Sequence, residues 1–227
     1  MMQLIFESGL FGLTLTFGVY ILTTRLNERT RCPVLHPVLM AILVIIGVLL
    51  VFDIPLQDYL DGANIITLML TPTTALLAYS IYNQLPLLKK YFIPIVAGCL
   101  AGSAASMVSV YVLCQVMGLG ETLTATMLPK SVTTPIAMEI SSQLGGISSV
   151  TVAAVVLTGI FGNILAPYLI KLFRIKNRIA AGVGIGCSSH AGGTSKAMEI
   201  GDVEGAMSGV SIGIAGILTV VLAMFVR

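Results

Sequence analysis

Long apolar runs separated by short charged segments dominate the sequence. Six of these runs are near the ~20 residues that an α-helix needs to cross the hydrocarbon core of a bilayer. They are Leu4–Thr23, Val34–Phe52, Ala63–Tyr82, Phe92–Met117, Ile147–Leu172 and Met207–Val226. The strands of a β-barrel would alternate apolar and polar residues over short segments, a pattern that this sequence lacks. The pattern therefore predicts an all-α polytopic membrane protein with about six full spans in the lipid bilayer.

Two further stretches are apolar but interrupted. Neither Glu121–Gly146 nor Ile179–Gly205 holds an uninterrupted apolar run that is long enough to cross. Lys and Arg follow the first, third and fifth long runs, whereas acidic residues follow the second and fourth. Because Lys and Arg favour cytoplasmic loops, each interrupted stretch is predicted to enter and leave on one face, as a re-entrant or broken-helix hairpin. The alternative is that these stretches cross fully, which would place the cationic segment Lys171–Arg178 outside.

A repeat relates the two interrupted stretches. Residues Thr133–Val156 align with Gly193–Gly216 sixty positions later, and both copies contain the tetrapeptide AMEI. One full span lies between the copies, so they are predicted to have opposite orientations in the membrane. Inverted repeats with discontinuous helices are typical of secondary transporters, whose sites lie near the bilayer midplane. We therefore expect residues 1–118 to form scaffold or partner-contacting spans and residues 119–227 to form an inverted-repeat transport unit.

Polar residues gather at the break of each hairpin, where a helix is predicted to begin: Ile136–Ser142 after SVTTP, and Lys196–Ile200 after GGTS. The free N–H groups and the dipole of a helix N-terminus favour a small anion, and hydroxyls and glycines allow close contact with it. The alternatives are that the hydroxyls only satisfy the broken backbone and that Lys130 extends to the membrane surface. The candidate substrate-binding residues are Lys130, Ser131, Thr133, Thr134, Ser188, Ser189, His190, Gly192, Gly193, Thr194 and Ser195.

Three more polar residues are candidates for coupling transport to an ion: Glu139, Lys196 and Asn163. Ionisable groups at membrane depth are functional by default, and protonation of Glu139 would couple transport to pH. No nucleophile–base pair, metal-ligand cluster or phosphate-binding loop is recognisable, so we expect no enzyme, no metal site and no cofactor. The net charge of +2 is too small to indicate a nucleic-acid partner.

Three segments carry a family resemblance: LPKSVTTPIAMEIS, GIFGNILAPYL and CSSHAGGTSKAMEIG. They closely resemble the LrgB/CidB family of bacterial inner-membrane proteins, and the likeness covers nearly the whole chain. The resemblance implies two functions. Some members are called antiholin-like and act with a small LrgA/CidA-type membrane partner to modulate murein hydrolase activity and lysis. Plant relatives carry glycolate and glycerate, and bacterial relatives are linked to pyruvate, lactate or similar acids.

The chemistry of the two breaks favours the transporter over the antiholin-like role. A small monocarboxylate is an anion with additional hydrogen-bond acceptors, which suits paired helix N-termini and hydroxyls. We therefore expect ion-coupled transport of such an acid by alternating access, in a multi-pass protein of the bacterial inner membrane. Symmetry favours a homodimer.

Overall fold

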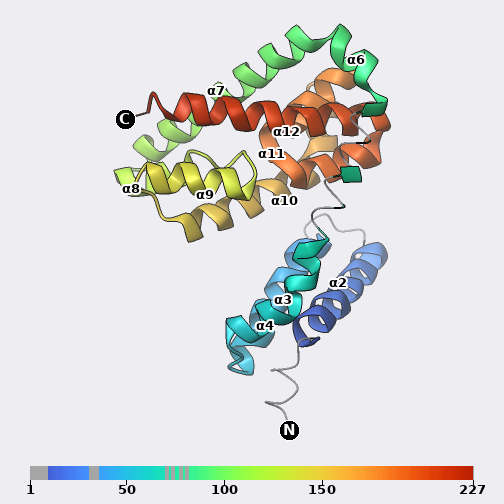
Figure 1. Cartoon of the computed structure of the whole chain (residues 1–227), viewed down its shortest axis with the longest axis vertical. Helices are drawn as coiled ribbons and strands as arrows, with labels where there is room; N and C mark the ends of the chain where they lie inside the picture. The colour runs from blue at the N-terminus through green and yellow to red at the C-terminus, as the bar shows by residue number, and fades with distance from the viewer. Residues whose placement is uncertain are drawn as a thin grey trace. The chain divides into compact units, whose positions relative to one another are not determined.

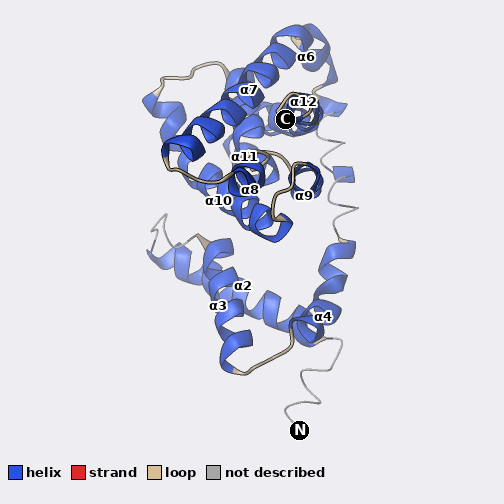
Figure 2. Cartoon of the chain, turned by 90° about the vertical axis from the view of Figure 1, so that its left-hand side faces the viewer, coloured by secondary structure: helices blue, strands red, loops and turns tan. Residues whose placement is uncertain are grey.

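The computed structural model describes residues 10–30, 36–69 and 82–226, together with residues 72, 75, 76 and 79. Every regular element within these ranges is an α-helix (Figure 2). The contacts divide the chain into two compact units, Met1–Leu76 and Leu77–Arg227. This architecture confirms the predicted all-α membrane fold. The predicted division into scaffold or partner-contacting spans (residues 1–118) and a transport unit (residues 119–227) is a division by function, and it stays a prediction.

The first unit contains three described helices around a small apolar cluster. Val19, Ala41 and Ile45 form the buried part of this cluster. A hydrogen bond of 2.9 Å between the Thr16 and Tyr59 hydroxyls adds a polar link. The helices are α2 (Phe11–Thr30), α3 (Pro37–Val51) and α4 (Leu56–Leu68).

The first three predicted spans match these helices only in part. The second half of α2 carries Arg25, Glu28 and Arg29, and α3 has 15 residues, fewer than a typical span. The segment between the second and third runs was expected to be a loop, but it is helical from Leu56 onward. Much of the predicted span Ala63–Tyr82 lies outside the described residues.

The second unit contains the three described helices that are long and apolar enough to cross a membrane, α7, α10 and α12. They correspond to the fourth, fifth and sixth predicted spans. Shorter or interrupted helices pack between them. The elements are α6 (Leu85–Lys90), α7 (Phe92–Val116), α8 (Glu121–Met127), α9 (Thr134–Gln143), α10 (Ser148–Leu172), α11 (Arg178–Ile200) and α12 (Asp202–Ala223).

The first interrupted stretch folds as a hairpin that returns to its starting end. Its arms are α8 and α9, and residues 128–133 between them form what we call the first break. Glu121 at the start of α8 and Gln143 at the end of α9 line one cleft of about 690 Å³. The last part of α7, including Tyr111 and Gln115, lines the same cleft. The stretch therefore enters and leaves at the end of the unit where α7 ends.

The second interrupted stretch is also a hairpin. α11 has non-helical backbone at Ser189 and His190, the second break. Arg178 at the start of α11 is paired with Glu204 at the start of α12, so the stretch returns to its own starting end. A second cleft of about 330 Å³ is lined by Ile179 and by Pro94 of early α7, so this hairpin starts where α7 begins.

The two hairpins therefore enter the unit from opposite ends. Figure 1 shows α7 running from α6 at the upper right to α8 at the left, and α12 ending on that same left side. The arms of the second hairpin have about ten residues each, or about 15 Å at 1.5 Å per residue. That length is about half of a ~30 Å hydrocarbon core, so the second break can lie near mid-depth.

The structure reproduces the sequence repeat at the level of contacts. The Thr151 hydroxyl donates to the carbonyl of Ile147 at 3.2 Å, and Ser211, sixty positions later, donates to Met207 at 2.7 Å. The two AMEI segments also match, because Ala137 and Ala197 are fully buried. The same local packing is therefore built twice.

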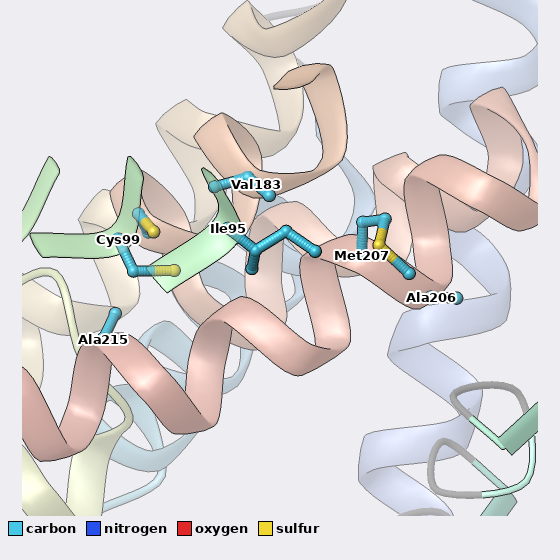
Figure 3. Packing of buried hydrophobic residues seen from close by; sticks show 7 residues of the cluster. Ile95, Cys99, Val183, Ala206, Met207 and Ala215 are labelled. Carbon is cyan, nitrogen blue, oxygen red and sulfur yellow. The ribbon is translucent and has the colours of Figure 1, made fainter. Parts of the chain in front are cut away.

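Buried apolar clusters hold α7 against both hairpins. At one end Ile95 and Cys99 of α7 pack with Val183 of α11 and Met207 of α12 (Figure 3). At the other end Met107 and Val110 of α7 join a cluster with residues of α8, α9 and α12. α7 is therefore in contact with both halves of the repeat.

Opposite entry of the hairpins predicts opposite labelling. We expect a membrane-impermeant maleimide to label Glu121→Cys on intact cells and to label Lys176→Cys only after permeabilisation, because Lys and Arg favour the cytoplasm. Both positions are exposed, and the native Cys99, Cys114 and Cys187 are buried.

The labelling background is a Cys32→Ser variant, and labelling of both sites in permeabilised cells is the control. Labelling of Lys176→Cys on intact cells would show that the stretch 121–146 crosses fully.

Candidate functional site

The first break contributes a lysine and a serine, and the serine contacts α7. The Ser131 hydroxyl lies 2.8 Å from the Ser106 hydroxyl, and Lys130 donates to Ser131 over 3.4 Å. Ser131 is buried and Lys130 is half-buried. α9 begins directly after the break. Pro135 lies in its first turn, where a backbone N–H would have no helical partner, so proline's missing N–H costs no hydrogen bond. The first break thus joins an ammonium, two hydroxyls and a helix N-terminus.

The second break is centred on His190, whose backbone is strained. Its φ of 43° and ψ of −140° lie in a region that non-glycine residues rarely adopt. The ring nitrogen Nε2 donates to the Val155 carbonyl at 2.9 Å, and Gly192 N–H points to Nδ1 at 3.5 Å. A carbonyl can only accept, so Nε2 carries the proton and Nδ1 is the acceptor.

Side chains from α10, α11 and α12 bind backbone carbonyls of the first turn after the break. The Thr194 hydroxyl donates to the His190 carbonyl at 2.8 Å and lies 2.7 Å from the Ser208 hydroxyl. Asn163 donates to the Gly192 carbonyl at 3.1 Å and to the Ser195 hydroxyl at 2.9 Å. Unsatisfied backbone groups cost several kcal/mol each in lipid, so these bonds stabilise the interrupted helix.

Glycines on α10 make room for the second break. A Cβ on Gly162 would lie 2.0 Å from the Cβ of Ser189, and one on Gly159 would lie 2.9 Å from the His190 ring. On the facing segment, a Cβ on Gly192 would lie 2.6 Å from the Cα of Gly159. The backbones of α10 and α11 therefore touch where the break occurs.

Val155 of α10 connects the two breaks. Its side chain packs in a buried cluster with Val132 of the first break and Ala137 of α9. Its carbonyl accepts the hydrogen bond from His190 of the second break. Two segments about sixty residues apart in sequence thus meet at one residue of the helix between them.

The predicted site residues do not all lie at this meeting point. Lys130, Ser131, Ser189, His190 and Thr194 take part in the contacts just described. Thr133 and Thr134 at the start of α9 and Gly193 on α11 are half-buried or buried beside the breaks, whereas Ser188 and Ser195 are exposed.

The second helix start was expected at Lys196, after the sequence GGTS, and that expectation is wrong. The backbone is helical again directly after His190, with Gly192 packed on Gly159 of α10 and Gly193 against Ile185 and Ser189 of the first arm of α11.

The candidate coupling residues are positioned differently from one another. Glu139 is exposed and accepts a hydrogen bond of 2.8 Å from Gln143, one turn along α9. Lys196 forms an ion pair with Glu199 on its own helix. Asn163 contacts the second break directly. A coupling role for these three residues stays a prediction.

Two serines of α7 were not singled out by the sequence analysis. Ser106 contacts the first break, and Ser103 is buried with an exposed fraction of 3%. The Ser103 hydroxyl has no hydrogen-bond partner among the described residues, which costs roughly 1–3 kcal/mol for a buried polar group. The available signal was the hydroxyl-rich segment GSAASMVS within an otherwise apolar run.

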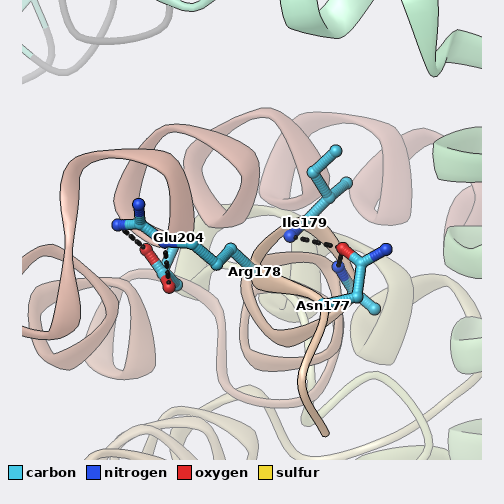
Figure 4. Close-up of polar contacts among 5 residues, drawn as sticks. Asn177, Arg178, Ile179 and Glu204 are labelled. Atoms are coloured by element: carbon cyan, nitrogen blue, oxygen red, sulfur yellow. Dashed lines mark hydrogen bonds and ion pairs between the residues drawn. The ribbon is translucent and has the colours of Figure 1, made fainter.

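An ion pair fixes the starting end of the second hairpin. Arg178 donates to both carboxylate oxygens of Glu204, at 2.8 and 2.9 Å (Figure 4). The hydrogen bond and charge of Glu204 raise the pKa of the Arg178 guanidinium, which therefore stays protonated. Asn177 accepts from the Ile179 and Ala180 N–H groups and caps α11.

The fold and this pair of breaks define a class, that of multi-pass α-helical membrane proteins with two interrupted, oppositely entering hairpins. Residues 16–227 match the LrgB-like family. The chain belongs to this family and is a multi-pass bacterial membrane protein, as the sequence motifs predicted.

Several relatives align along nearly their whole length. The chain is 38% identical to the uncharacterized protein YwbG of Bacillus subtilis (strain 168), with 96% of each chain covered. It is 34% identical to the antiholin-like protein LrgB of the same strain, covering 97% of this chain and 96% of LrgB. It is 33% identical to the holin-like protein CidB of Staphylococcus epidermidis (strain ATCC 12228), covering 92% and 91%. No solved structure matches.

The close packing of α10 on the second break yields a stability prediction. We expect Gly162→Ala to destabilise the purified protein by about 1–3 kcal/mol, because the new methyl group overlaps Ser189. The measurement is the thermal unfolding midpoint in detergent.

Gly213→Ala on α12 is the matched control for this prediction. A Cβ there meets nothing within 4 Å, so we expect no loss of stability. Equal midpoints for the two variants would contradict the packing of the second break against α10.

Proposed function

We propose that this protein is a secondary transporter of small monocarboxylate anions of the glycolate, glycerate, lactate or pyruvate type, coupled to an ion and working by alternating access. The proposal gives the chain a non-enzymatic role. The observation that carries it is the meeting of the two breaks at Val155, which contacts the first through its side chain and the second through its carbonyl.

The chemistry around this meeting point suits a carboxylate. Lys130 supplies positive charge at membrane depth, where ionisable residues are functional by default. The Ser131 and Ser106 hydroxyls lie beside it. α9 and the second arm of α11 both begin at the breaks, so the positive ends of two helix dipoles point to this region. A small anion would gain from all of these groups.

Two clefts at opposite ends of the second unit are consistent with access from either side. The cleft of about 690 Å³ includes Leu128, the first residue of the first break. The cleft of about 330 Å³ includes Val183 of the first arm of α11. Alternating access requires a site that connects to each side in turn, and inverted repeats supply two related routes. The unequal volumes match a state that is more open at the end of the first hairpin.

Coupling to protons could act through the second break. Protonation of His190 would turn Nδ1 into a donor, and the contact with Gly192 N–H would then be lost. The break would be loosened on the side of α11 that packs on Gly159. Proton binding and the shape of the site are linked by this one ring, and Glu139 and Lys196 are secondary candidates.

Uptake by reconstituted protein tests the transport proposal. We expect liposomes containing the protein to accumulate labelled glycolate, lactate or pyruvate in a saturable way under a proton or sodium gradient. Lys130→Met should reduce this uptake by at least about tenfold, because a charge-assisted contact to the carboxylate is removed. Lys176→Met, at an exposed lysine outside the long helices, should leave uptake unchanged.

Saturable uptake that is equal in Lys130→Met and wild type would remove the site from the proposal. Leakage of an entrapped dye without carboxylate uptake would support a pore instead. Measurement with and without an LrgA-type partner shows whether the chain transports alone, and the size of the purified particle tests the proposed homodimer.

The names of the relatives favour a second function. LrgB of Bacillus subtilis is called antiholin-like and CidB of Staphylococcus epidermidis holin-like. These names support a role in lysis more directly than they support transport. In this second proposal the protein acts with an LrgA/CidA-type membrane partner to modulate murein hydrolase activity.

A lysis assay separates the two functions. If the lytic role is independent of transport, loss of this gene should change murein hydrolase activity in zymograms and the rate of autolysis. Complementation with Lys130→Met should then restore the wild-type rate. Failure of Lys130→Met to complement, with normal expression, would indicate that any effect on lysis follows from transport.

A further inference from the structure

α7 and the first arm of α11 approach each other closely through two glycines. Gly98 and Gly102 of α7 have the GxxxG spacing that lets membrane helices pack with their backbones close together. A Cβ on Gly98 would lie 3.4 Å from Cγ1 of Val183, and one on Gly102 would lie 3.2 Å from the Cβ of Cys187. Val183 and Cys187 are also four residues apart, so the two helices follow each other here for a full turn.

This packing brings two cysteines together. Cys99 lies beside Gly98 on α7, and its thiol is within hydrogen-bonding reach of the Cys187 thiol. Both side chains belong to the buried apolar cluster of Figure 3. A disulfide needs Cα atoms no more than about 7 Å apart, and packing through glycines favours such an approach. The pair therefore has the proximity that a disulfide requires.

A buried cysteine usually serves as a small apolar residue. Cys114, near the end of α7, fits that description, because its cluster includes no second cysteine among the described residues. Cys99 and Cys187 differ from it in being neighbours that come from separate helices. A bond between them would join α7 to the second hairpin.

The second cleft borders this pair of cysteines. Ile95, Gly98 and Val183 line the cleft of about 330 Å³, and Ile95 and Val183 also pack in the cluster that holds the two thiols. The cysteines are 0% and 5% exposed, which excludes charged or bulky reagents, whereas hydrogen peroxide is uncharged and only slightly larger than water. The cleft lies at the predicted cytoplasmic end, where disulfides are usually transient and redox-sensing.

We propose that Cys99 and Cys187 form a redox-sensitive pair, which a peroxide converts to a disulfide that locks the second hairpin to α7. One sulfur attacks the O–O bond of hydrogen peroxide, which gives a sulfenic acid and releases water. The other thiol then displaces the sulfenic oxygen as a second water, and the S–S bond forms. The pair loses two electrons and two protons, the peroxide is reduced, and an added dithiol reverses the step by exchange.

The disulfide would act directly beside the second break. Cys187 lies two residues before Ser189, the first residue with non-helical backbone in α11. A covalent bond at this point holds the first arm of α11 on α7, so movement of the second hairpin relative to α7 stops. This consequence rests on the proposed transport function, since alternating access requires one part of the protein to move against another. Formation of the disulfide does not depend on that function.

Thiol counting tests the disulfide. Purified Cys32→Ser protein is treated with hydrogen peroxide, denatured with N-ethylmaleimide to block free thiols, then reduced and labelled with a maleimide that carries a polyethylene glycol mass tag. We expect two tags per chain, and mass spectrometry of unreduced peptides should show residues 99 and 187 linked. No tags, or a link to another cysteine, would overturn the proposal, and neither result depends on how well a variant folds.

Two further substitutions in the Cys32→Ser background give the matched comparison. Cys187→Ala should remove both tags, whereas Cys114→Ala, at the unpaired buried cysteine of α7, should keep both. Tags that persist in Cys187→Ala would overturn the pairing.

Uptake into proteoliposomes tests the lock. We expect peroxide to reduce labelled lactate uptake by Cys32→Ser at least about tenfold, because locking one state prevents alternating access, and dithiothreitol to restore it. Addition of Cys187→Ala should make uptake insensitive to peroxide. A disulfide with unchanged uptake would overturn the lock and leave the transport proposal standing. Absence of uptake by the reduced protein would instead overturn transport, and the thiol count would still decide whether the redox pair exists.

Discussion

An interrupted helix inside a membrane depends on finding partners for the backbone groups that it releases. At the second break the hydroxyls of Ser188 and Ser189 donate to the carbonyl of Ile185, in the last turn before the break, at 3.2 and 2.8 Å. α10 and the start of α12 hold the turn after the break: the Val155 carbonyl accepts from the His190 ring, Asn163 binds the Gly192 carbonyl, and Ser208 supports Thr194, which in turn binds the His190 carbonyl. Each unsatisfied backbone group would cost several kcal/mol in lipid, so partners of this kind favour a break at this place. The strained backbone of His190 persists because the bonds on every side hold it.

The same stretch of α10 also sets the distance between the breaks. Gly159 and Gly162 allow α11 to approach until backbones touch, and Val155 fills the space toward the first break. A larger residue at either glycine would move the second break away from α10, and a smaller one at position 155 would open a cavity beside the first. The geometry of the candidate site is therefore fixed largely by small and apolar residues of α10, with Asn163 as the polar contact to the second break.

The elements that sequence reasoning predicted are those that depend on length and periodicity. α7, α10 and α12 follow from long apolar runs, and the returning hairpins follow from runs too short to cross together with the alternation of charge. The position of the second break could not be predicted in this way. Gly192 and Gly193 were expected to lie before a helix start and to allow close approach of a ligand, but both are helical, and Gly192 instead allows close approach of Gly159 of α10. The role of Val155 could not be predicted either. It binds His190 through its backbone carbonyl, a group that every residue has, so the residue type gives no signal. Nothing in the sequence distinguished Ser103 and Ser106 from other small residues of an apolar helix. The structure shows that Ser106 contacts Ser131 and that the buried Ser103 hydroxyl has no hydrogen-bond partner among the described residues.

α7 borders the cleft at each end of the second unit, with Pro94 and Gly98 in one and Tyr111 and Gln115 in the other. A helix of 25 residues spans about 37 Å and moves as a rod if its hydrogen bonds stay intact. Ser103 and Ser106 lie near the middle of this rod. Because the same rigid element forms part of both cleft walls, any tilt of α7 would change the shape of the two openings together.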